Sequence, residues 1–203
     1  EKFNNTIESV SAKVLYRDNV GRDFGGYACV LDRYSKTGLI DSYDFFVFMN
    51  QTVIGPLLPD WSKNLFHWSS IFTDLINKKD KLAGLSINCL IPREMKRDGL
   101  DLPLYSLTPD GRSIFAPHVQ TMLFAMDKLG LELALDAGIF NYENTITGID
   151  AEDKERIILE KEIRLSEIIL QNNYNISSLQ EYSRDIDFRK GNFNEAWGNP
   201  WSG

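Results

Sequence analysis

The chain has 203 residues, of which 43% are hydrophobic and 12% aromatic, so it can bury the core of one globular domain. Its formal net charge is −7 and its lysines and arginines form no dense run, which argues against a nucleic acid as partner. The two cysteines, Cys29 and Cys89, lack metal-ligand spacing, so we expect free, buried thiols in a reducing compartment.

The lengths of the apolar runs indicate whether the chain can cross a membrane. No apolar run approaches the roughly 18 to 20 residues that span a bilayer, and no basic, apolar leader opens the chain. We therefore expect no transmembrane segment, and either a cytoplasmic protein or a soluble domain of a larger polypeptide.

The stretch "LYRDNVGRDFGGYACVLDRY", residues 15–34, joins an apolar run to a helical pattern through charged residues and glycines. Lys13 to Tyr16 are expected to end a short strand, and from Tyr27 onward apolar residues recur at helical spacing. Asp23 is the predicted N-cap, with the double glycine in the first turn. The backbone N–H groups of such a turn suit a phosphate. The alternative is that the glycines only let the helix pack close to the sheet.

Strand and helix patterns alternate along the rest of the chain. The segment "YDFFVFMN", residues 43–50, is a continuous apolar run, which predicts a strand in the middle of a sheet, covered on both faces. The alternation indicates one α/β domain with a mixed or mainly parallel sheet. The further predicted elements are strands at 81–91, 118–126 and 174–179, helices at 61–77, 127–140 and 151–172, and a long loop at 92–117.

Five blocks in this order resemble nucleotide-sugar glycosyltransferases of the GT-A fold. They are "DNVGRDFGGY", "YDFFVFMNQTVIGPLLP", "KLAGLSINC", "HVQTMLFAMDKLGLELAL" and "KEIRLSEIILQNNYNI". The nearest similarity is to enzymes that build rhamnan- or capsule-type surface polysaccharides in bacteria, with related domains in algae and large DNA viruses. The resemblance covers residues 14–187. It implies a GT-A-like, Rossmann-like α/β domain at residues 1–187, with a mixed, mainly parallel sheet flanked by helices, and a tail at 188–203.

The resemblance assigns nucleotide-sugar contacts to the loop before the first helix. An Asn-x-Gly segment after an early strand contacts the nucleotide sugar in such enzymes, and here it is represented by Asn19 and Gly21, followed by Arg22 and Asp23. The planar guanidinium of Arg22 suits phosphate oxygens. Asp23 would orient an arginine or accept a bond from a sugar hydroxyl. The alternative for Arg22 and Asp23 is a surface salt bridge plus a helix cap.

The resemblance also implies an Asp-x-Asp pair that holds Mn²⁺ or Mg²⁺ against the diphosphate. The matching place reads Asn50, Gln51 and Thr52, so the carboxylates are absent and metal dependence is in doubt. The three residues are still expected to contact the nucleotide sugar, with Asn50 bonded to ribose or sugar. The alternative is a polar strand end that caps a turn.

The third element that the resemblance implies is the catalytic base of an inverting enzyme. In "KEIRLSEIILQNNYNI" the family's basic carboxylate falls on Glu162, while Lys161 replaces the first acid of the pair. Glu162 can act on an acceptor hydroxyl only from a helix start or a kink that faces the site. The alternative is a solvated helix residue, like Glu160, paired with a neighbouring arginine or lysine.

The histidines and tryptophans are weaker candidates. His118 would bind the acceptor or a metal, or it is a packing residue at a strand start. His67 is expected to be structural. Trp61 and Trp68 are predicted to lie in the core, while Trp197 and Trp201 would cover an acceptor or dock on the domain.

One departure from the family concerns the N-terminus. GT-A domains open with a strand whose following loop holds the nucleobase, whereas this chain begins with "EKFNNTIESV", which is typical of the end of a helix or loop. The first strand-helix unit is short or missing, either because the sequence is a fragment or because the base pocket is built differently.

Two functional hypotheses follow. The leading one is an inverting hexosyl- or deoxyhexosyltransferase of polysaccharide biosynthesis, with a nucleotide-diphosphate sugar and a glycan acceptor as partners. The alternative is a non-catalytic carbohydrate- or nucleotide-sugar-binding domain on the same scaffold, favoured by the missing Asp-x-Asp pair and the short N-terminus.

Overall fold

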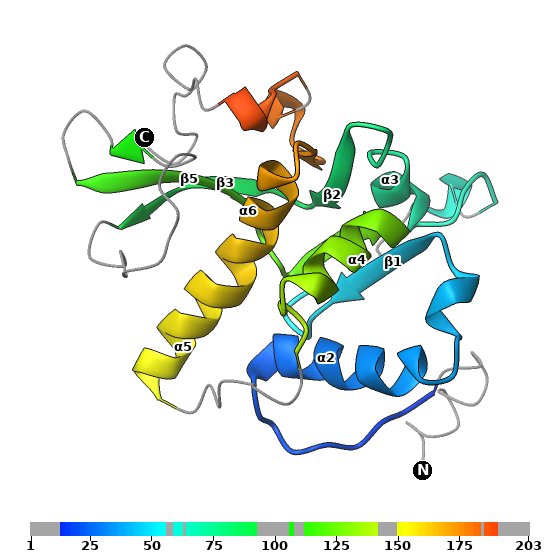
Figure 1. Cartoon of the computed structure of the whole chain (residues 1–203). Helices are drawn as coiled ribbons and strands as arrows, with labels where there is room; N and C mark the ends of the chain where they lie inside the picture. Colours follow the sequence, from blue (N-terminus) through cyan, green and yellow to red (C-terminus); the bar gives the residue numbers. More distant parts are fainter. Residues whose placement is uncertain are drawn as a thin grey trace.

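The computed structural model describes residues 13–55, 59–62, 64–92, 106–107, 112–141, 150–183 and 185–190. These residues form a mixed α/β arrangement of two sheets and several helices (Figure 1). One sheet has the strand order β1-β6-β2-β7 and the other the order β3-β5-β4. The strands are β1 (Phe45–Met49), β2 (Asp80–Gly84), β3 (Ile87–Pro92), β4 (Ser106–Leu107), β5 (Ser113–Val119), β6 (Leu123–Asp127) and β7 (Asn175–Ser178).

The four-stranded sheet is mixed but not mainly parallel, which corrects the prediction. Strand β6 pairs antiparallel with both β1 and β2, and only the β2–β7 pair is parallel. The second sheet is antiparallel throughout. The predicted strand 81–91 is in fact two strands, β2 and β3, that belong to different sheets. Gly84 lies at this break, where a Cβ atom would collide with the Val119 side chain, so its lack of a side chain lets the two sheets meet.

Strand β1 is an edge strand of the described sheet and not a central one, because β6 is its only partner among the described strands. The aromatic run predicted burial on both faces, but Phe45 and Met49 are each 44% exposed. Phe48 alone is fully buried in β1, and it faces the helices. The apolar run therefore reflects packing of Phe46 and Phe48 against the helices, of Val47 against the smaller cluster on the other face, and of Met49 along a cavity described below.

The longer helices are those that the sequence predicted best. They are α2 (Arg22–Ser35), α4 (Lys128–Asp136) and a continuous helical rod of α5 (Ala151–Ile157), η5 (Ile158–Ile163) and α6 (Arg164–Gln171), seen in Figure 1. The η5 segment is a π-helical turn. The short elements are α3 (Ser70–Thr73), η1 (Ile40–Ser42), η2 (Asp60–Ser62), η6 (Glu181–Ser183) and η7 (Phe188–Lys190).

Several predictions of local structure are wrong. The long loop expected at 92–117 contains β4 and most of β5, and the strand expected at 118–126 is divided by the turn between β5 and β6. The helix expected at 61–77 is reduced to η2 and α3, and Trp61, which was placed in the core, is 73% exposed. Residues 13–20 form no strand, although a strand end was expected at Lys13 to Tyr16. Trp68 does pack against the core, and His67 bonds locally to Ser69, as a structural histidine would. Trp197 and Trp201 lie outside the described residues.

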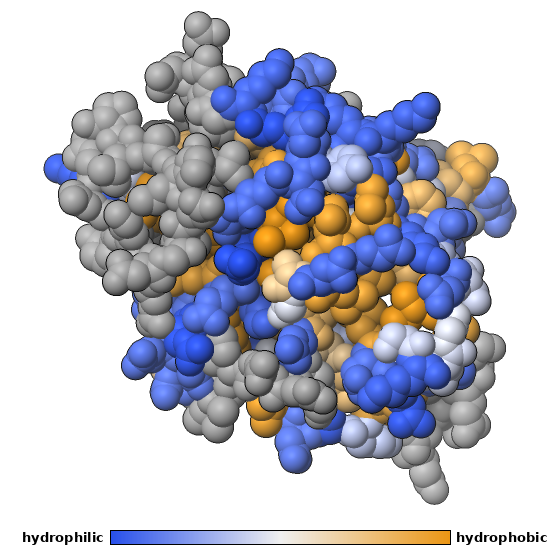
Figure 2. Space-filling view, in the orientation of Figure 1, coloured by the Kyte–Doolittle hydropathy of each residue, from blue (hydrophilic) through white to orange (hydrophobic). Residues whose placement is uncertain are grey.

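Side chains of the four-stranded sheet alternate between two apolar layers. Phe124 and Met126 of β6 face the core formed with α2, α4 and α6, while Leu123 and Ala125 face a smaller cluster beneath α3. A third cluster joins η5 to β3 and β5. Apolar side chains gather on the face where α4 lies, surrounded by hydrophilic residues (Figure 2).

Some remaining sequence predictions also concern this core. Both cysteines are free, Cys89 is buried and Cys29 is half-buried. Phe188, the first residue of the predicted tail, is buried in the main core. Within the described part of the chain, no helix has the length and apolar character needed to cross a membrane.

Candidate functional site

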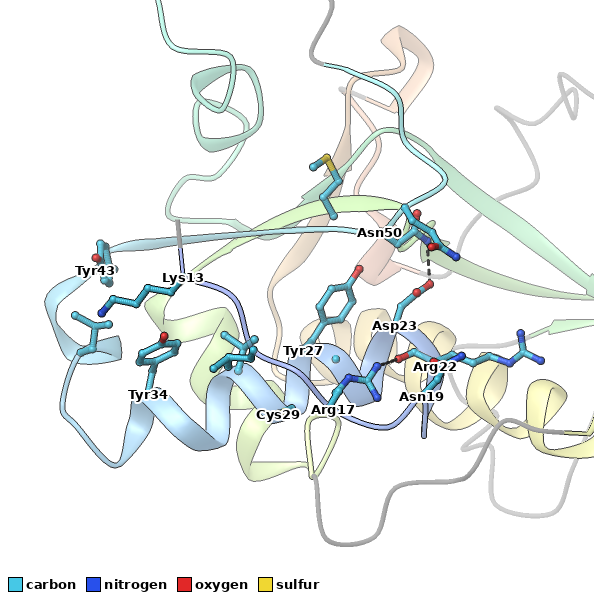
Figure 3. Close-up of a pocket in the computed structure, with 16 residues that line it drawn as sticks. Lys13, Arg17, Asn19, Arg22, Asp23, Tyr27, Cys29, Tyr34, Tyr43 and Asn50 are labelled. Carbon is cyan, nitrogen blue, oxygen red and sulfur yellow. Dashed lines mark hydrogen bonds between the residues drawn. The ribbon is translucent and has the colours of Figure 1, made fainter. Parts of the chain in front are cut away.

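A cavity of about 820 Å³ opens along α2, between the extended segment 13–19 and the end of β1 (Figure 3). Its volume is in the range of small-molecule sites. Three cationic side chains and one carboxylate line it, although the whole chain carries a net charge of −7. The lining residues that matter here are Lys13, Arg17, Asn19, Arg22, Asp23, Tyr27, Tyr34, Tyr43, Met49, Asn50 and Gln51. An anion is therefore the ligand that this lining favours.

Arg17 fixes the loop before α2. Its guanidinium donates hydrogen bonds to the carbonyl oxygens of Asp18 and Val20 at 2.7 Å and to that of Arg22 at 2.6 Å. Figure 3 shows the side chain lying against the first turn of α2. The sequence analysis did not single out Arg17, although its position in the first of two Arg-Asp pairs was a signal.

The glycines of this loop serve close packing. A Cβ atom on Gly25 would collide with the carbonyl oxygen of Val20, and one on Gly26 would lie 3.1 Å from the Arg17 guanidinium. Gly21, with φ 74°, is the N-cap of α2, so the prediction of Asp23 as N-cap is wrong. The double glycine thus allows the loop before α2 to approach the helix, whereas the alternative from the sequence was close packing of the helix on the sheet.

The Asp23 carboxylate does not cap α2 and instead contacts the end of β1. The Nδ2 group of Asn50 donates a hydrogen bond of 3.0 Å to the Asp23 carboxylate, as Figure 3 shows. The Oδ1 atom of Asn50 accepts bonds from the backbone N–H and the hydroxyl of Thr52. The predicted residues Asn50 and Thr52 thus form one network with Asp23.

Arg22 lies beside this network at the start of α2 and also lines the cavity. It makes no ion pair or side-chain hydrogen bond with another described residue, so its five donors are available to a ligand. Asn19 and Gln51 line the same cavity, whereas Gly21 faces a smaller cavity next to Lys161.

The turn between β5 and β6 joins Asn50 to Glu162. The backbone N–H of Asn50 bonds to the carbonyl of Met122 at 2.9 Å, and the hydroxyl of Thr121 donates a bond of 2.9 Å to the Glu162 carboxylate. Because Thr121 and Met122 are adjacent, the structure brings Glu162 close to the Asn50–Asp23 pair despite a separation of more than a hundred residues. Glu162 does not itself line the cavity described above.

Glu162 is positioned by the π-helical turn η5. A π turn inserts an extra residue into a helix, which rotates the side chains that follow, and such turns are frequent at functional sites. The neighbouring charged residues have other partners. Glu160 pairs with Arg156 on the surface at 3.1 Å, and the Lys161 ammonium donates a hydrogen bond of 2.8 Å to the Gly138 carbonyl. Glu162 makes neither contact, and it turns toward Thr121.

The surroundings of Glu162 favour its protonated form. Burial raises the pKa of the Glu162 carboxyl, hydrogen bonds from the hydroxyl and backbone of Thr121 oppose this, and the charge of Asp23 raises it further. The influence of Asp23 is a second sign that the two carboxylates are neighbours. A carboxylate with a raised pKa is a stronger base than an ordinary glutamate.

Two further acidic residues, Asp127 and Asp150, have structural roles. Asp127 caps α4 through a bond from the Gly130 N–H and forms an ion pair with Lys81 at 2.6 Å. Asp150 caps α5 through a bond from the Asp153 N–H. Their carboxylates are thus engaged in the fold.

His118 lies at the end of β5 with 4% of its surface exposed. Its ring bonds through Nδ1 to the Ala116 carbonyl at 2.7 Å, and burial lowers its pKa to about 4 in spite of that bond. It does not line the cavity. This placement favours the packing role that the sequence left open, and the acceptor or metal role stays a prediction.

The place of the Asp-x-Asp pair does not fit a tightly held divalent cation. The only side-chain oxygen of Asn50 already accepts two bonds from Thr52, and Gln51 and Thr52 offer neutral ligands. Among the described residues, no three histidines, cysteines or acids are grouped so as to bind a metal. Mn²⁺ or Mg²⁺ would find one carboxylate here, that of Asp23.

Comparisons with known proteins leave the site to be interpreted from its geometry. No family model, no curated protein and no solved structure matches the chain.

The close approach at Gly25 gives a prediction about the loop. We expect Gly25→Ala to lower the free energy of unfolding by about 1 to 3 kcal/mol, because the new methyl group displaces the Val20 carbonyl that Arg17 holds. Gly26→Ala is the matched control, since only the flexible end of Arg17 must give way there. Urea denaturation of both variants measures the difference. Equal effects at the two positions would show that the collision is absorbed without cost.

Proposed function

We propose that this chain is an inverting glycosyltransferase that moves a sugar from a nucleotide diphosphate to a glycan acceptor. The observation that carries the proposal is the juxtaposition of an arginine-bearing cavity with the Asp23–Asn50–Glu162 group around the β5–β6 turn. The resemblance of the five sequence blocks to surface-polysaccharide enzymes of the GT-A fold supports the same reaction.

The dimensions of the cavity suit an extended donor. It follows α2 from Arg22 to Tyr34, which at the rise of a helix is roughly 18 Å. Arg22, Asp23 and Asn50 lie at the end nearest Glu162, so we assign this end to the diphosphate and the sugar. Tyr34 and Tyr43 lie with Lys13 at the other end (Figure 3), which is where the base would be held.

The chemistry would use two charged groups of the chain. Glu162 takes the proton of the acceptor hydroxyl, whose oxygen attacks the anomeric carbon of the sugar. The bond from that carbon to the diphosphate oxygen breaks, and the diphosphate leaves with the electron pair. The guanidinium of Arg22 stabilises the negative charge that builds on the leaving group. No step is assigned to a metal, because the Asn50 region does not fit one.

A second candidate function is binding without catalysis. The neutral Asn50-Gln51-Thr52 segment, whose Asn50 oxygen is already used within the fold, favours it. A domain of this kind would hold a nucleotide sugar or a carbohydrate in the same cavity and leave it unchanged.

Ligand-induced stabilisation tests the proposed function. We expect UDP, GDP or another nucleoside diphosphate to raise the melting temperature of the protein, because a ligand that binds only the folded chain stabilises it in proportion to the logarithm of its concentration over Kd. The measurement is a thermal shift across a panel of nucleoside diphosphates, with and without manganese. If no member of the panel changes the melting temperature, the chain is not a nucleotide-sugar enzyme.

Arg22 should decide the affinity for the diphosphate. We expect Arg22→Ala to weaken binding of the stabilising nucleotide by about 1.5 to 3 kcal/mol, the range of a charge-assisted hydrogen bond. The stability of the free protein should stay within about 0.5 kcal/mol, since Arg22 is exposed. Calorimetric titration measures the affinity, with Arg33→Ala in the last turn of the same helix as control. Equal affinities in the two variants would remove Arg22 from the site.

Glu162 should decide turnover. We expect Glu162→Gln to keep donor affinity and lower the transfer rate by roughly 10²- to 10⁴-fold, as loss of a general base does. In the parent protein the rate should rise with pH through the raised pKa of Glu162, because only the deprotonated base can accept the proton, and the variant should lack this rise. Glu160→Gln, two residues away on the surface, is the matched control. A binding domain without catalysis would show no transfer in either protein.

A further inference from the structure

The hydroxyl of Tyr27 lacks a partner in the described structure. Tyr27 lies one helical turn after Asp23 on α2, and both side chains point toward the end of β1 (Figure 3). Its ring packs edge-to-face on Phe24, Phe48 and Phe124, with centroids 5.2 to 5.9 Å away. Its oxygen is shielded from solvent and has no hydrogen-bond partner among the described residues.

Such a hydroxyl is unusual, because buried tyrosine hydroxyls normally find a hydrogen-bond partner and a missing one destabilises the fold. Phenylalanine would fill the same aromatic contacts without this cost. The packing of α2 therefore does not account for the oxygen atom, and a ligand contact would.

The charges of both carboxylates of the site act on this hydroxyl. Burial raises the pKa of Tyr27, and the charges of Asp23 and then Glu162 raise it further, so the phenol keeps its proton and is available as a hydrogen-bond donor. Neither carboxylate accepts that proton in this structure, where Asp23 is bonded to Asn50 and Glu162 to Thr121. The donor is thus held ready next to both acids.

We propose that the Tyr27 hydroxyl is a positioning donor for the transferred sugar, and that it bonds to a sugar oxygen at the inner end of the cavity, next to Glu162. The assignment to a sugar rests on the proposed function. Arg22 precedes Asp23 on α2 and Tyr27 follows it by one turn, so a sugar that folds back along α2 from a diphosphate bound at Arg22 would meet Tyr27. Since the oxygen is shielded in the free chain, the sugar reaches it by separating Asp23 from Asn50, which a single exposed hydrogen bond joins.

Tyr27→Phe tests the proposal because a structural role and a ligand role predict opposite results. If the hydroxyl awaits a ligand, the variant should melt at the same temperature as the parent or higher. Its affinity for UDP or GDP should stay within about twofold of the parent's. Its affinity for the matching nucleotide sugars, UDP-glucose, UDP-galactose and GDP-mannose, should fall about three- to tenfold, the equivalent of one neutral hydrogen bond.

Tyr16→Phe is the control, since the Tyr16 side chain is exposed and does not line the cavity. Calorimetric titration of each diphosphate and its sugar conjugate separates the sugar contact from a phosphate contact. A loss shared by the diphosphate and the conjugate would overturn the sugar assignment. Unchanged affinity for every conjugate that the parent binds would overturn the ligand contact and leave the proposed function standing.

The free protein gives an independent result. A melting temperature several degrees below the parent's would show that the Tyr27 hydroxyl has a structural partner, such as a buried water, and would overturn the proposal by itself. If the parent binds no nucleoside diphosphate and no conjugate, the proposed function fails first and the sugar contact fails with it.

Discussion

Aromatic packing between α2 and the edge of the four-stranded sheet is the contact on which the site depends. The ring of Phe48 in β1 is stacked on Phe124 of β6 at 4.8 Å and on Phe140 at 5.4 Å, and Tyr27 of α2 meets Phe48 edge-to-face at 5.2 Å. Pairs of this kind stabilise by about 0.5 to 1.5 kcal/mol beyond the area that they bury. Because they fix the rotation of α2 against β1, they also decide that Asp23 points at the end of that strand.

A second constraint aligns the opposite side of the site. The β5–β6 turn joins the two sheets, and its backbone and side chains hold the end of β1 on one side and the π turn on the other. Ile163, in the same π turn, is buried against the β3–β5 sheet. Glu162 and its neighbours therefore lie on rigid elements, which keep the geometry of a site precise. The cavity next to them is bounded instead by an extended segment that the Arg17 guanidinium holds through hydrogen bonds.

The sequence predicted elements whose signal is local. The period of the apolar residues in α2, the helix that begins at Ala151 and the strand after Asn173 can all be recognised within a dozen residues, and the structure contains each of them. The sequence pattern was misleading where the position of a strand in its sheet depends on which other strands it pairs with. Residues 43–50 and 81–91 are equally apolar, yet one is an edge strand and the other divides between two sheets at Gly84, because burial by helices and by strands leaves the same pattern.

The residues of the candidate site also fall into those that the sequence predicted and those that it did not. Arg22, Asp23 and Asn50 follow recognisable blocks, and the structure places them around one cavity. Arg17 was missed although the three carbonyl oxygens that it binds lie within five residues of it, because the fold of the loop decides which oxygens face the guanidinium. Tyr27 was missed because its surroundings include Phe48, Phe124 and Glu162, which are distant in the sequence.

The neutral residue at position 50 follows from the electrostatics of this group. An aspartate there would place a third carboxylate next to Asp23 and Glu162, whose charges already disfavour each other. Like charges at such distances raise one another's pKa unless a cation lies between them. Asn50 removes that conflict, because its amide donates to the Asp23 carboxylate where an aspartate would repel it. The amide does for Asp23 part of what a divalent ion does for an Asp-x-Asp pair, and the charge of a bound diphosphate is then left to the arginine beside it.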